Sequence, residues 1–329
     1  MKVLVTGANG FLGSWLTRRL CQDGHKVTVL IRGSSDISEI EDLPIAKKFG
    51  DITDVESLYA AFRGQEVIFH LAGLIAYRAS DRAKMEEINI RGTRNVVNVL
   101  KDLNIPELVY LSSVVAIGAG FSKDQVLNEK SDYNLTPLNL GYFETKRAAE
   151  IYVREQCSKS GFRALILNPS TIYGGGDAKK GSRGIQIKVA KGQMPFYPLG
   201  GVNVVAVEDV IEGIISAWKK GRSGERYILC GDNMTIQELF KTIAGFAGVA
   251  PPAWPVPFPV LRAVGWAGDH LAPLGVKLPF SLENAWTSHL YHWFDCTKAQ
   301  TELGFRPSSS SLAIEKSVSW MRAHGLLKK

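Results

Sequence analysis

Three polar side chains, Ser113, Tyr142 and Lys146, are of the types that exchange a proton with a carbonyl or an alcohol. Tyr142 and Lys146 stand four residues apart in GYFETKRAAE, so a helix places both on one face. An ammonium group beside a phenol favours the ionised phenol, so we expect a lowered pKa for Tyr142. Ser113 ends the apolar run LVYLSS and can hydrogen-bond the same substrate oxygen. The alternative is a tyrosine and a lysine exposed on one helix without any catalytic role.

A glycine-rich turn, VLVTGANGFLGS, lies between an apolar run and a helical pattern near the N-terminus. Gly7 permits a tight turn, Gly10 lets the backbone approach a pyrophosphate, and Gly13 allows the helix to pack closely on the strand. The start of the helix adds free N–H groups and the positive end of the helix dipole. The turn therefore predicts dinucleotide binding, and the alternative is a turn that only needs glycines for packing.

Two further segments carry residues suited to the same ligand. In GDITD, an acid such as Asp51 can accept a hydrogen bond from an adenine amino group, although an acid there can equally cap the following helix. In HLAG, the small residues Ala72 and Gly73 leave room for a flat cofactor. Because parallel strands end at one edge of a sheet, we expect these segments to lie beside the glycine turn.

Arg32 follows the apolar run VTVLI, at the place where a dinucleotide domain usually has an acid that binds the ribose of NAD. A carboxylate there would repel the extra phosphate of NADP, whereas a guanidinium can bind it through two hydrogen bonds. Ser34 and Ser35 can add hydroxyl contacts, and Asp36 lies too far along the loop. We therefore predict NADP, used as NADPH, with NAD as the alternative if Arg32 only faces solvent.

The elements that must position these residues alternate between strands and helices. Runs such as VTVLI, VIFHL and LVYLSS lack polar alternation, which is typical of strands buried on both faces. We expect strands at 3–6, 27–31, 45–49, 67–71, 108–112 and 164–167, and helices at 11–23, 55–62, 83–103 and 142–160. The pattern predicts an α/β fold: a Rossmann-type doubly wound parallel sheet with a smaller, mostly C-terminal substrate lobe.

We expect the chain to divide into two parts. Residues 1–168, with about 203–230, should form the NADP-binding Rossmann domain, and residues 169–202 and 231–329 the substrate-binding lobe and C-terminal helices. In the second part, Thr235 and Glu238 predict a capping box for a helix through Phe246. The aromatic-rich stretch before residue 294 predicts either an ordinary small core or an apolar pocket for a hydrophobic carbonyl substrate.

Composition excludes several classes of protein. The chain has 329 residues, of which 45% are hydrophobic, and a formal net charge of +7. No block of five or six like charges occurs, so we expect no nucleic-acid partner. Neither a transmembrane run of about 18 apolar residues nor a signal peptide is evident, so we expect a cytoplasmic protein. The cysteines and histidines show no metal-ligand spacing, so we expect no metal.

The combined motifs resemble those of the extended short-chain dehydrogenase/reductase superfamily over essentially the whole chain. The matching segments are TGANGFLG, GDITD, HLAG, LSS, YFETK, NPSTIYG and FDCTKAQTELGFRP. The resemblance implies that Tyr142 is the acid/base, that Lys146 positions the nicotinamide ribose and that Ser113 steadies the reacting oxygen. It also implies a homodimer formed through the long helices of the cofactor lobe.

Two branches of the superfamily resemble this chain. TGANGFLGSW followed by VTVLIR is similar to dihydroflavonol 4-reductases, in which an arginine also stands at the position of Arg32. KGQMPFY, VAVEDV and GERYIL are similar to hopanoid-associated sugar epimerases, and 3β-hydroxysteroid dehydrogenases share the general plan. Two positions depart from these patterns: Gly118 replaces the substrate-reading Asn of plant reductases, and Ala206 stands where extended members often have His. The first departure argues against a flavonoid substrate.

The predicted function is NADPH-dependent reduction of a small ketone or aldehyde, with Tyr142 as the proton donor. One alternative is a nucleotide-sugar epimerase or dehydratase with tightly bound NAD(P), whose diphosphate the basic run Lys179, Lys180 and Arg183 could bind. The other is a non-catalytic NADP-binding sensor. The residues expected to contact the cofactor are Gly7, Asn9, Gly10, Phe11, Leu12, Gly13, Arg32, Asp51, Ile52, Leu71, Ala72, Gly73, Ser112, Tyr142, Lys146, Asn168, Pro169, Ser170 and Ile172.

Overall fold

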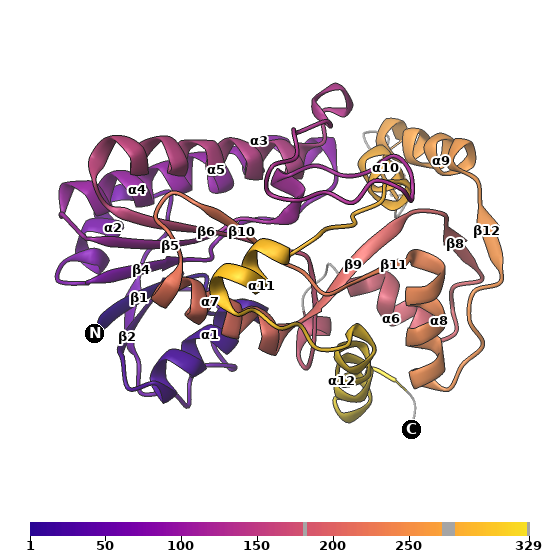
Figure 1. Cartoon of the computed structure of the whole chain (residues 1–329). Coiled ribbons are helices and arrows are strands. Elements are labelled where there is room, and N and C mark those ends of the chain that lie inside the picture. Colours follow the sequence, from indigo (N-terminus) through magenta and orange to yellow (C-terminus); the bar gives the residue numbers. More distant parts are fainter. Residues whose placement is uncertain (180–182, 272–279, 328–329) are drawn as a thin grey trace.

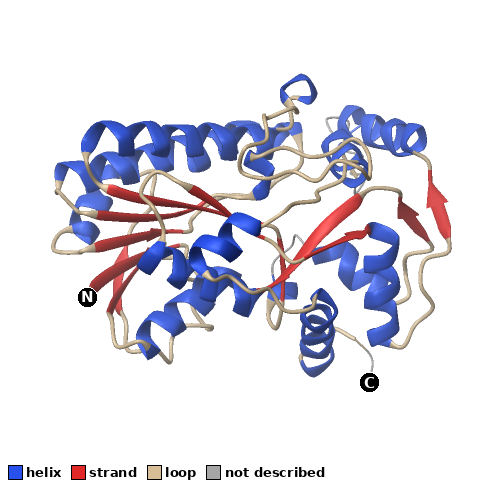
Figure 2. Cartoon of the chain, viewed as in Figure 1, coloured by secondary structure: helices blue, strands red, loops and turns tan. Residues whose placement is uncertain are grey.

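The computed structural model describes residues 1–179, 183–271 and 280–327 (Figure 1). Its larger part is a seven-stranded parallel sheet between two layers of helices, which confirms the predicted Rossmann-type α/β fold (Figure 2). The strands lie in the order β10-β6-β5-β4-β1-β2-β3, so the winding reverses beside β1. Ligands of such sheets bind beyond the carboxyl ends of the strands at that reversal. The strands of this sheet are β1 (Lys2–Thr6), β2 (Lys26–Ile31), β3 (Ala46–Phe49), β4 (Val67–His70), β5 (Glu107–Leu111), β6 (Arg163–Pro169) and β10 (Arg226–Leu229).

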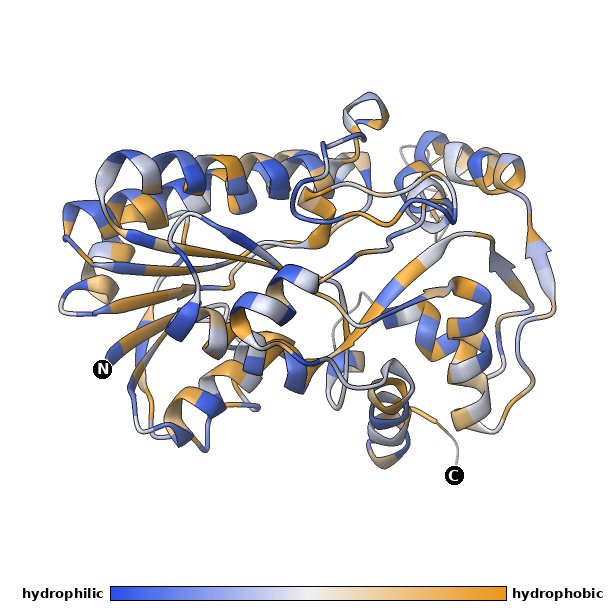
Figure 3. Ribbon diagram, in the orientation of Figure 1, coloured by the Kyte–Doolittle hydropathy of each residue, from blue (hydrophilic) through white to orange (hydrophobic). Residues whose placement is uncertain are grey.

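The apolar strands are buried on both faces, as the lack of alternation predicts. Val3 and Val5 of β1 belong to the core cluster that includes α1 (Phe11–Gln22) and α7 (Val207–Lys220). Leu4 belongs to the opposite cluster, with α2 (Val55–Phe62), α4 (Thr93–Asp102) and α5 (Gly141–Ser160). Figure 3 shows the strands between the two helical layers as mainly hydrophobic. This double burial fixes where each strand ends, and hence where the residues that follow it lie.

The predicted helix at 83–103 is continuous but irregular. It consists of α3 (Arg82–Met85), a π-helical segment (Glu86–Gly92) and α4. Asn89, in the π-helical segment, is buried, and its side chain accepts a hydrogen bond from Leu74 N at 2.8 Å and donates one to Leu74 O at 2.9 Å. The irregular turn therefore holds the segment that follows β4, and such turns often occur at functional sites.

The smaller lobe contains two short sheets. One has β7 (Thr171–Tyr173), β9 (Gly201–Ala206) and β11 (Asp232–Thr235), and the other pairs β8 (Phe196–Pro198) with β12 (Trp254–Val256). Residues 203–206 thus lie in the smaller sheet, whereas α7 and β10, which follow them, lie with the larger one. The helices of this part and of the C-terminal region are α6 (Gly184–Ala190), α8 (Ile236–Ala247), α9 (Phe258–Leu271), α10 (Leu282–His289), α11 (Thr297–Leu303) and α12 (Ser310–Ala323).

Two sequence predictions for the smaller lobe have different outcomes. The capping box is confirmed, because Thr235 Oγ1 accepts a hydrogen bond from Glu238 N and the Glu238 carboxylate accepts one from Thr235 N. The aromatic-rich stretch is neither simply a core nor simply a pocket lining, since Trp254 and Trp266 are exposed. Among the described residues, no helix has both the length and the apolar character needed to cross a bilayer.

Candidate active site

A cavity of about 880 Å³ lies at the carboxyl ends of the central strands and is also lined by residues of the smaller lobe. It brings together nearly all residues expected at the cofactor, which come from seven separate stretches of the chain. The exceptions are Lys146 and Asn168, which are buried behind its wall. The expected residues on its lining are Gly7, Asn9, Gly10, Phe11, Leu12, Gly13, Arg32, Asp51, Ile52, Leu71, Ala72, Gly73, Ser112, Ser113, Tyr142, Pro169, Ser170 and Ile172.

The glycine turn has the backbone geometry that a phosphate cradle needs. Gly7 has a φ of 73°, and its carbonyl oxygen accepts a hydrogen bond from Gly10 N at 3.0 Å. A Cβ at Gly13 would lie only 2.0 Å from the Gly7 oxygen, so a side chain there would push α1 away from the turn. α1 has no side-chain cap and no acidic residue in its first turn. Its N-terminus is therefore a fitting site for a pyrophosphate.

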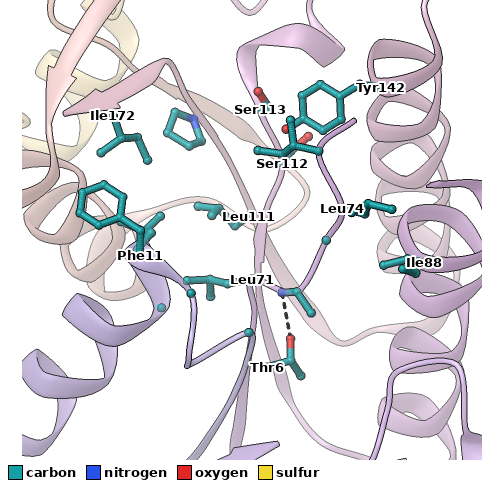
Figure 4. A pocket seen from close by; sticks show the side chains of 18 of the residues that line it. Thr6, Phe11, Leu71, Leu74, Ile88, Leu111, Ser112, Ser113, Tyr142 and Ile172 are labelled. Carbon is teal, nitrogen blue, oxygen red and sulfur yellow. Dashed lines mark hydrogen bonds between the residues drawn. The ribbon is translucent and has the colours of Figure 1, made fainter. Parts of the chain in front are cut away.

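The ends of β1 and β4 are tied together beneath the cavity. Thr6 Oγ1 lies 2.8 Å from His70 Nδ1 and accepts a hydrogen bond from Ala72 N at 3.2 Å (Figure 4). The other ring nitrogen of His70 lies 3.0 Å from Thr93 Oγ1. Burial lowers the pKa of His70 to about 3, so this histidine is neutral and structural. The small residues that follow it are thereby held against the cavity.

The two segments expected near the adenosine end of a dinucleotide also reach the cavity. Arg32 and Ser35 line it, and Ser35 N donates a hydrogen bond to Arg32 O at 2.9 Å, which closes the turn after β2. In GDITD the two predicted roles, contact with the adenine and capping of the next helix, fall on different residues. Asp54 caps α2 by accepting from Glu56 N at 3.2 Å, whereas Asp51 lines the cavity.

Tyr142 and Ser113 lie side by side in the wall of this cavity. Figure 4 shows the Tyr142 ring beside Ser112 and Ser113, with Phe11 and Ile172 on the opposite side. Tyr142 is 8% exposed, at the start of α5. Burial raises its pKa, the nearby Tyr77 hydroxyl adds to the rise, and a hydrogen bond with the Ser113 side chain opposes it. The phenol is therefore protonated at neutral pH and can donate a proton.

The expectation that Lys146 lowers the pKa of Tyr142 is wrong. Lys146 shares a helix face with Tyr142, but its Nζ donates to Leu111 O at 2.8 Å and to the Tyr110 hydroxyl at 3.3 Å. Burial also acts on the lysine itself and lowers its pKa to about 8, an effect that the Glu150 carboxylate opposes. The helical spacing shows which face the two residues share, but not how much water the fold removes from them.

Glu150, which sequence reasoning missed, organises the buried side of the site. It is 3% exposed, and its Oε2 accepts hydrogen bonds from Ser112 Oγ at 2.6 Å and from Asn168 Nδ2 at 2.7 Å. Asn168 Nδ2 also donates to Ser113 O at 2.9 Å. Arg226 Nη1 lies 3.4 Å from the other carboxylate oxygen. Its place one turn after Lys146 in YFETKRAAE was the available sequence signal.

Residues distant in sequence complete the end of the cavity near Tyr142. The Tyr77 ring centroid lies 6.0 Å from that of Tyr142, and Thr287 and His292 also line this end. His292 Nε2 lies 3.0 Å from Thr287 O, and burial lowers the pKa of His292 to about 4, so the ring is neutral. Sequence reasoning missed these three residues because no local spacing relates them.

The structure describes only part of the basic run Lys179, Lys180 and Arg183, which could bind a diphosphate. Lys180 and the side chain of Lys179 lie outside the described residues. Arg183 lines the cavity, but its Nε lies 3.6 Å from Asp177 Oδ2, its Nη2 donates to Ile172 O, and its guanidinium covers the Tyr173 ring. Its positive charge is therefore already balanced within the protein. Among the described residues, no group of three or more His, Cys, Asp and Glu could hold a metal ion.

Known proteins are similar to this chain along nearly its entire length. The profile of the NAD dependent epimerase/dehydratase family matches residues 3–230. The chain is 32% identical to the "Putative dihydroflavonol 4-reductase" of Synechocystis sp., over 98% of this chain and 95% of that protein. It is 28% identical to "Sterol demethylase protein B" of Methylococcus capsulatus, over 99% of this chain and 100% of that protein.

A solved structure agrees with these relationships. The crystal structure of gox2253 superposes with a TM-score of 0.87 at 33% identity and covers 99% of both chains. The family profile spans the glycine turn, the strand ends and the segment with Tyr142 and Lys146. The chain therefore belongs to the NAD dependent epimerase/dehydratase family, within the extended short-chain dehydrogenase/reductase superfamily, and is an NAD(P)-dependent oxidoreductase acting on CH–OH or carbonyl groups.

Proposed function

We propose that the protein is an NADPH-dependent reductase of a small, apolar ketone or aldehyde. The observation that carries the proposal is the arrangement of Ser113 and Tyr142 side by side in one cavity, with Arg32 at the end of β2 on the same cavity. Reduction of a carbonyl needs a hydride and a proton. Bound NADPH would supply the hydride, and a buried, protonated phenol can supply the proton.

In the proposed reaction, Ser113 orients the carbonyl oxygen by a hydrogen bond, and Tyr142 donates its proton to that oxygen as the carbon gains a hydride. The oxygen becomes a hydroxyl group, and Tyr142 regains its proton from solvent after the product leaves. Lys146 is a cation below pH 8, and its proposed role is to bind the nicotinamide ribose. It would thereby position the hydride donor relative to Tyr142 and Ser113.

The preference for NADPH rests on Arg32 and Ser35. A backbone hydrogen bond joins them, and both line the cavity that Gly10 and Asp51 also line. A guanidinium and a hydroxyl fit a 2′-phosphate, and no carboxylate stands at this strand end to bind the free ribose hydroxyls of NAD.

An apolar substrate is supported by the lining near Tyr142. Leu74, Ile75, Val115 and Phe143 line this part of the cavity, and His292 is neutral there. One relative carries a name that refers to an apolar compound, a sterol. We infer that the substrate is an uncharged carbonyl compound with an apolar body.

The test is an assay with a panel of apolar ketones and aldehydes, in which reduction is measured as the consumption of NADPH. We expect Tyr142→Phe to lower kcat about a hundred- to ten-thousandfold while NADPH still binds, because the proton donor alone is lost. Tyr152→Phe, on the same helix but not on the cavity lining, is the matched control for loss of a phenol hydroxyl. Full turnover by Tyr142→Phe would refute the proposed proton donor.

The cofactor preference has its own test. We expect Arg32→Ala to lower the ratio of kcat/KM with NADPH to kcat/KM with NADH by about ten- to a hundredfold. A loss of this size is expected when hydrogen bonds to a charged group are removed. Arg63→Ala, on the cofactor lobe at the end of α2, is the control for loss of a surface charge. An unchanged ratio would remove the argument for NADPH.

The epimerase or dehydratase alternative is favoured by one observation, the buried Arg183 on the cavity lining. Its ion pair with Asp177 weakens that argument. The two reactions differ in cofactor use, because an epimerase regenerates its cofactor and a reductase consumes it. Protein purified with stoichiometric bound cofactor, and no NADPH consumption with any carbonyl, would favour the epimerase. The oxidoreductase class of the family leaves the non-catalytic sensor without support.

A further inference from the structure

Large apolar side chains are exposed on β8, β12 and α9. These three elements lie on the side of the smaller lobe away from the larger sheet (Figure 1). We call this surface the α9 face and define it by Phe196, Trp254, Val260, Val264 and Trp266. Trp254 exposes 66% of its surface, Trp266 55% and Phe196 52%. Several large apolar side chains exposed on neighbouring elements are a feature of interaction sites.

The two strands hold the first part of this face in a defined arrangement. Trp254 and Phe196 are register partners in the parallel β8–β12 pair, so their exposed side chains are neighbours. Trp254 N and Ala253 N both donate to Pro195 O at 3.1 Å, which anchors the start of β12. The face is therefore built into the fold and is not a frayed loop.

The helix α9 continues the face, and its buried and exposed sides differ from those of an ordinary surface helix. Its buried residues are Gly265 and Gly268, whereas Val260, Val264 and Trp266 point outward. A Cβ at Gly265 would lie 2.6 Å from Ser281 O, so glycine is needed for the close packing of α9 on α10. An ordinary surface helix buries its large apolar residues and exposes its small or polar ones. α9 does the opposite.

The segments that build the α9 face carry exposed cations. These segments, 178–207 and 239–268, contain no Asp or Glu, and Glu238 directly precedes the second one. Lys188, Lys191, Lys241 and Arg262 in these segments are exposed. The first acid after α9 begins, Asp269, is half-buried and accepts a hydrogen bond from Leu282 N at 2.9 Å, which directs it toward α10.

We propose that the α9 face binds the surface of an anionic lipid bilayer, with α9 lying in the plane of the headgroups. Tryptophan residues and a helix with an exposed apolar side sit at the boundary of headgroups and acyl chains, and lysines and arginines are attracted to anionic lipids. A second copy of the chain fits less well. In a symmetric dimer through this face, the cations of these two segments would approach those of the second copy, which disfavours the contact.

The position of the α9 face close to the cavity would suit an enzyme with an apolar substrate. α10 packs on α9, and its Thr287 lines the cavity near Tyr142, so one helix separates the bilayer-bound face from the site. Bilayer binding itself does not depend on the proposed reductase function, because it is measured without substrate or cofactor.

The experiment is co-sedimentation of the full chain with vesicles of phosphatidylcholine alone and of phosphatidylcholine mixed with phosphatidylglycerol. We expect binding to the anionic vesicles that falls with added salt. The double variant Trp254→Ala/Trp266→Ala should weaken this binding at least about tenfold, because most of the apolar anchor is removed. Arg262→Glu should weaken it as well and should reduce the preference for anionic over neutral vesicles.

Two matched controls lie outside the face. Phe49→Ala removes an aromatic residue that is 68% exposed on β3, and Lys159→Glu makes the same charge change as Arg262→Glu at the end of α5. Both should bind vesicles as the unchanged protein does, and thermal unfolding confirms that every variant is folded. Absence of binding to anionic vesicles would overturn the proposal, as would equal losses in the controls. A dimer that Trp254→Ala/Trp266→Ala converts to a monomer, without vesicle binding, would assign the face to a second copy.

Discussion

At the scale of single residues, burial decides the chemistry of Tyr142 and Lys146. Burial raises the pKa of the phenol and lowers the pKa of the ammonium group to about 8, so each neutral form is favoured. Because the pKa of Lys146 is below its ordinary value of 10.5, burial of the charged lysine costs stability below pH 8. That cost disappears as the pH rises from about 8 toward 10.5.

The same pKa predicts how the reaction depends on pH. Reduction should slow as the pH rises through about 8, because Lys146 loses the proton that makes it a cation. The measurement is kcat with saturating NADPH from neutral to alkaline pH. Lys146→Arg keeps a cation at all these pH values, so any residual activity of that variant should lack the alkaline decline. A decline that persists in Lys146→Arg would assign it to another group.

Glu150 acts on Lys146 and on Ser113 without reaching the cavity. Its negative charge opposes the fall in the pKa of Lys146, so Glu150→Gln should lower that pKa further. The alkaline limb of the rate profile should then move to lower pH. The variant should also lose about 1.5–3 kcal/mol of stability, since the half-buried Arg226 loses a charged partner and keeps its hydrogen bonds to Glu129 O. A profile that keeps its position while stability falls would show a purely structural role.

At the scale of elements, the junction of β1 and α1 sets the position of the cofactor turn. Gly13→Ala would place a Cβ 2.0 Å from Gly7 O, so α1 must move or the turn must open. We expect a loss of about 1–3 kcal/mol in the free energy of unfolding, together with weaker cofactor binding. Chemical denaturation and a titration with NADPH measure the two effects.

A helical glycine elsewhere supplies the control for that change. A Cβ at Gly245 in α8 would meet nothing within 4 Å, so Gly245→Ala should raise stability by up to about 1 kcal/mol through its helix propensity. If Gly13→Ala were equally harmless, the close packing of α1 against the turn would not be what places the helix N-terminus.

At the scale of the whole molecule, the cavity takes its walls from both parts of the chain. Gly10 and Arg32 come from the larger sheet, and Arg183, Thr287 and His292 come from the smaller lobe and the C-terminal region. A ligand that touches both parts should stabilise them together. At a hundredfold excess over its Kd, NADPH should add about 2.7 kcal/mol to the free energy of unfolding. Thermal unfolding should show this shift in the unchanged protein and a smaller one in Arg32→Ala.

The sequence by itself determined the parts that depend on local spacing. The apolar runs predicted six strands of the large sheet, and the glycine turn, the strand-end residues and the shared face of Tyr142 and Lys146 followed from neighbouring positions. Residues one helical turn or one strand end apart have nearly fixed relative positions. The order of the strands then brought these separate motifs to one cavity.

Only the tertiary structure decided what depends on distant contacts and on the exclusion of water. It separated the role of Asp51 from that of Asp54, reversed the expected direction of the pKa of Tyr142, and brought Tyr77 and His292 to the same cavity end. It also turned Trp266 outward, because glycines of α9 occupy the packed side, and it left Trp254 exposed on β12. Periodicity shows that a residue is apolar, but whether it meets a core, a cavity or the exterior depends on what the rest of the chain covers.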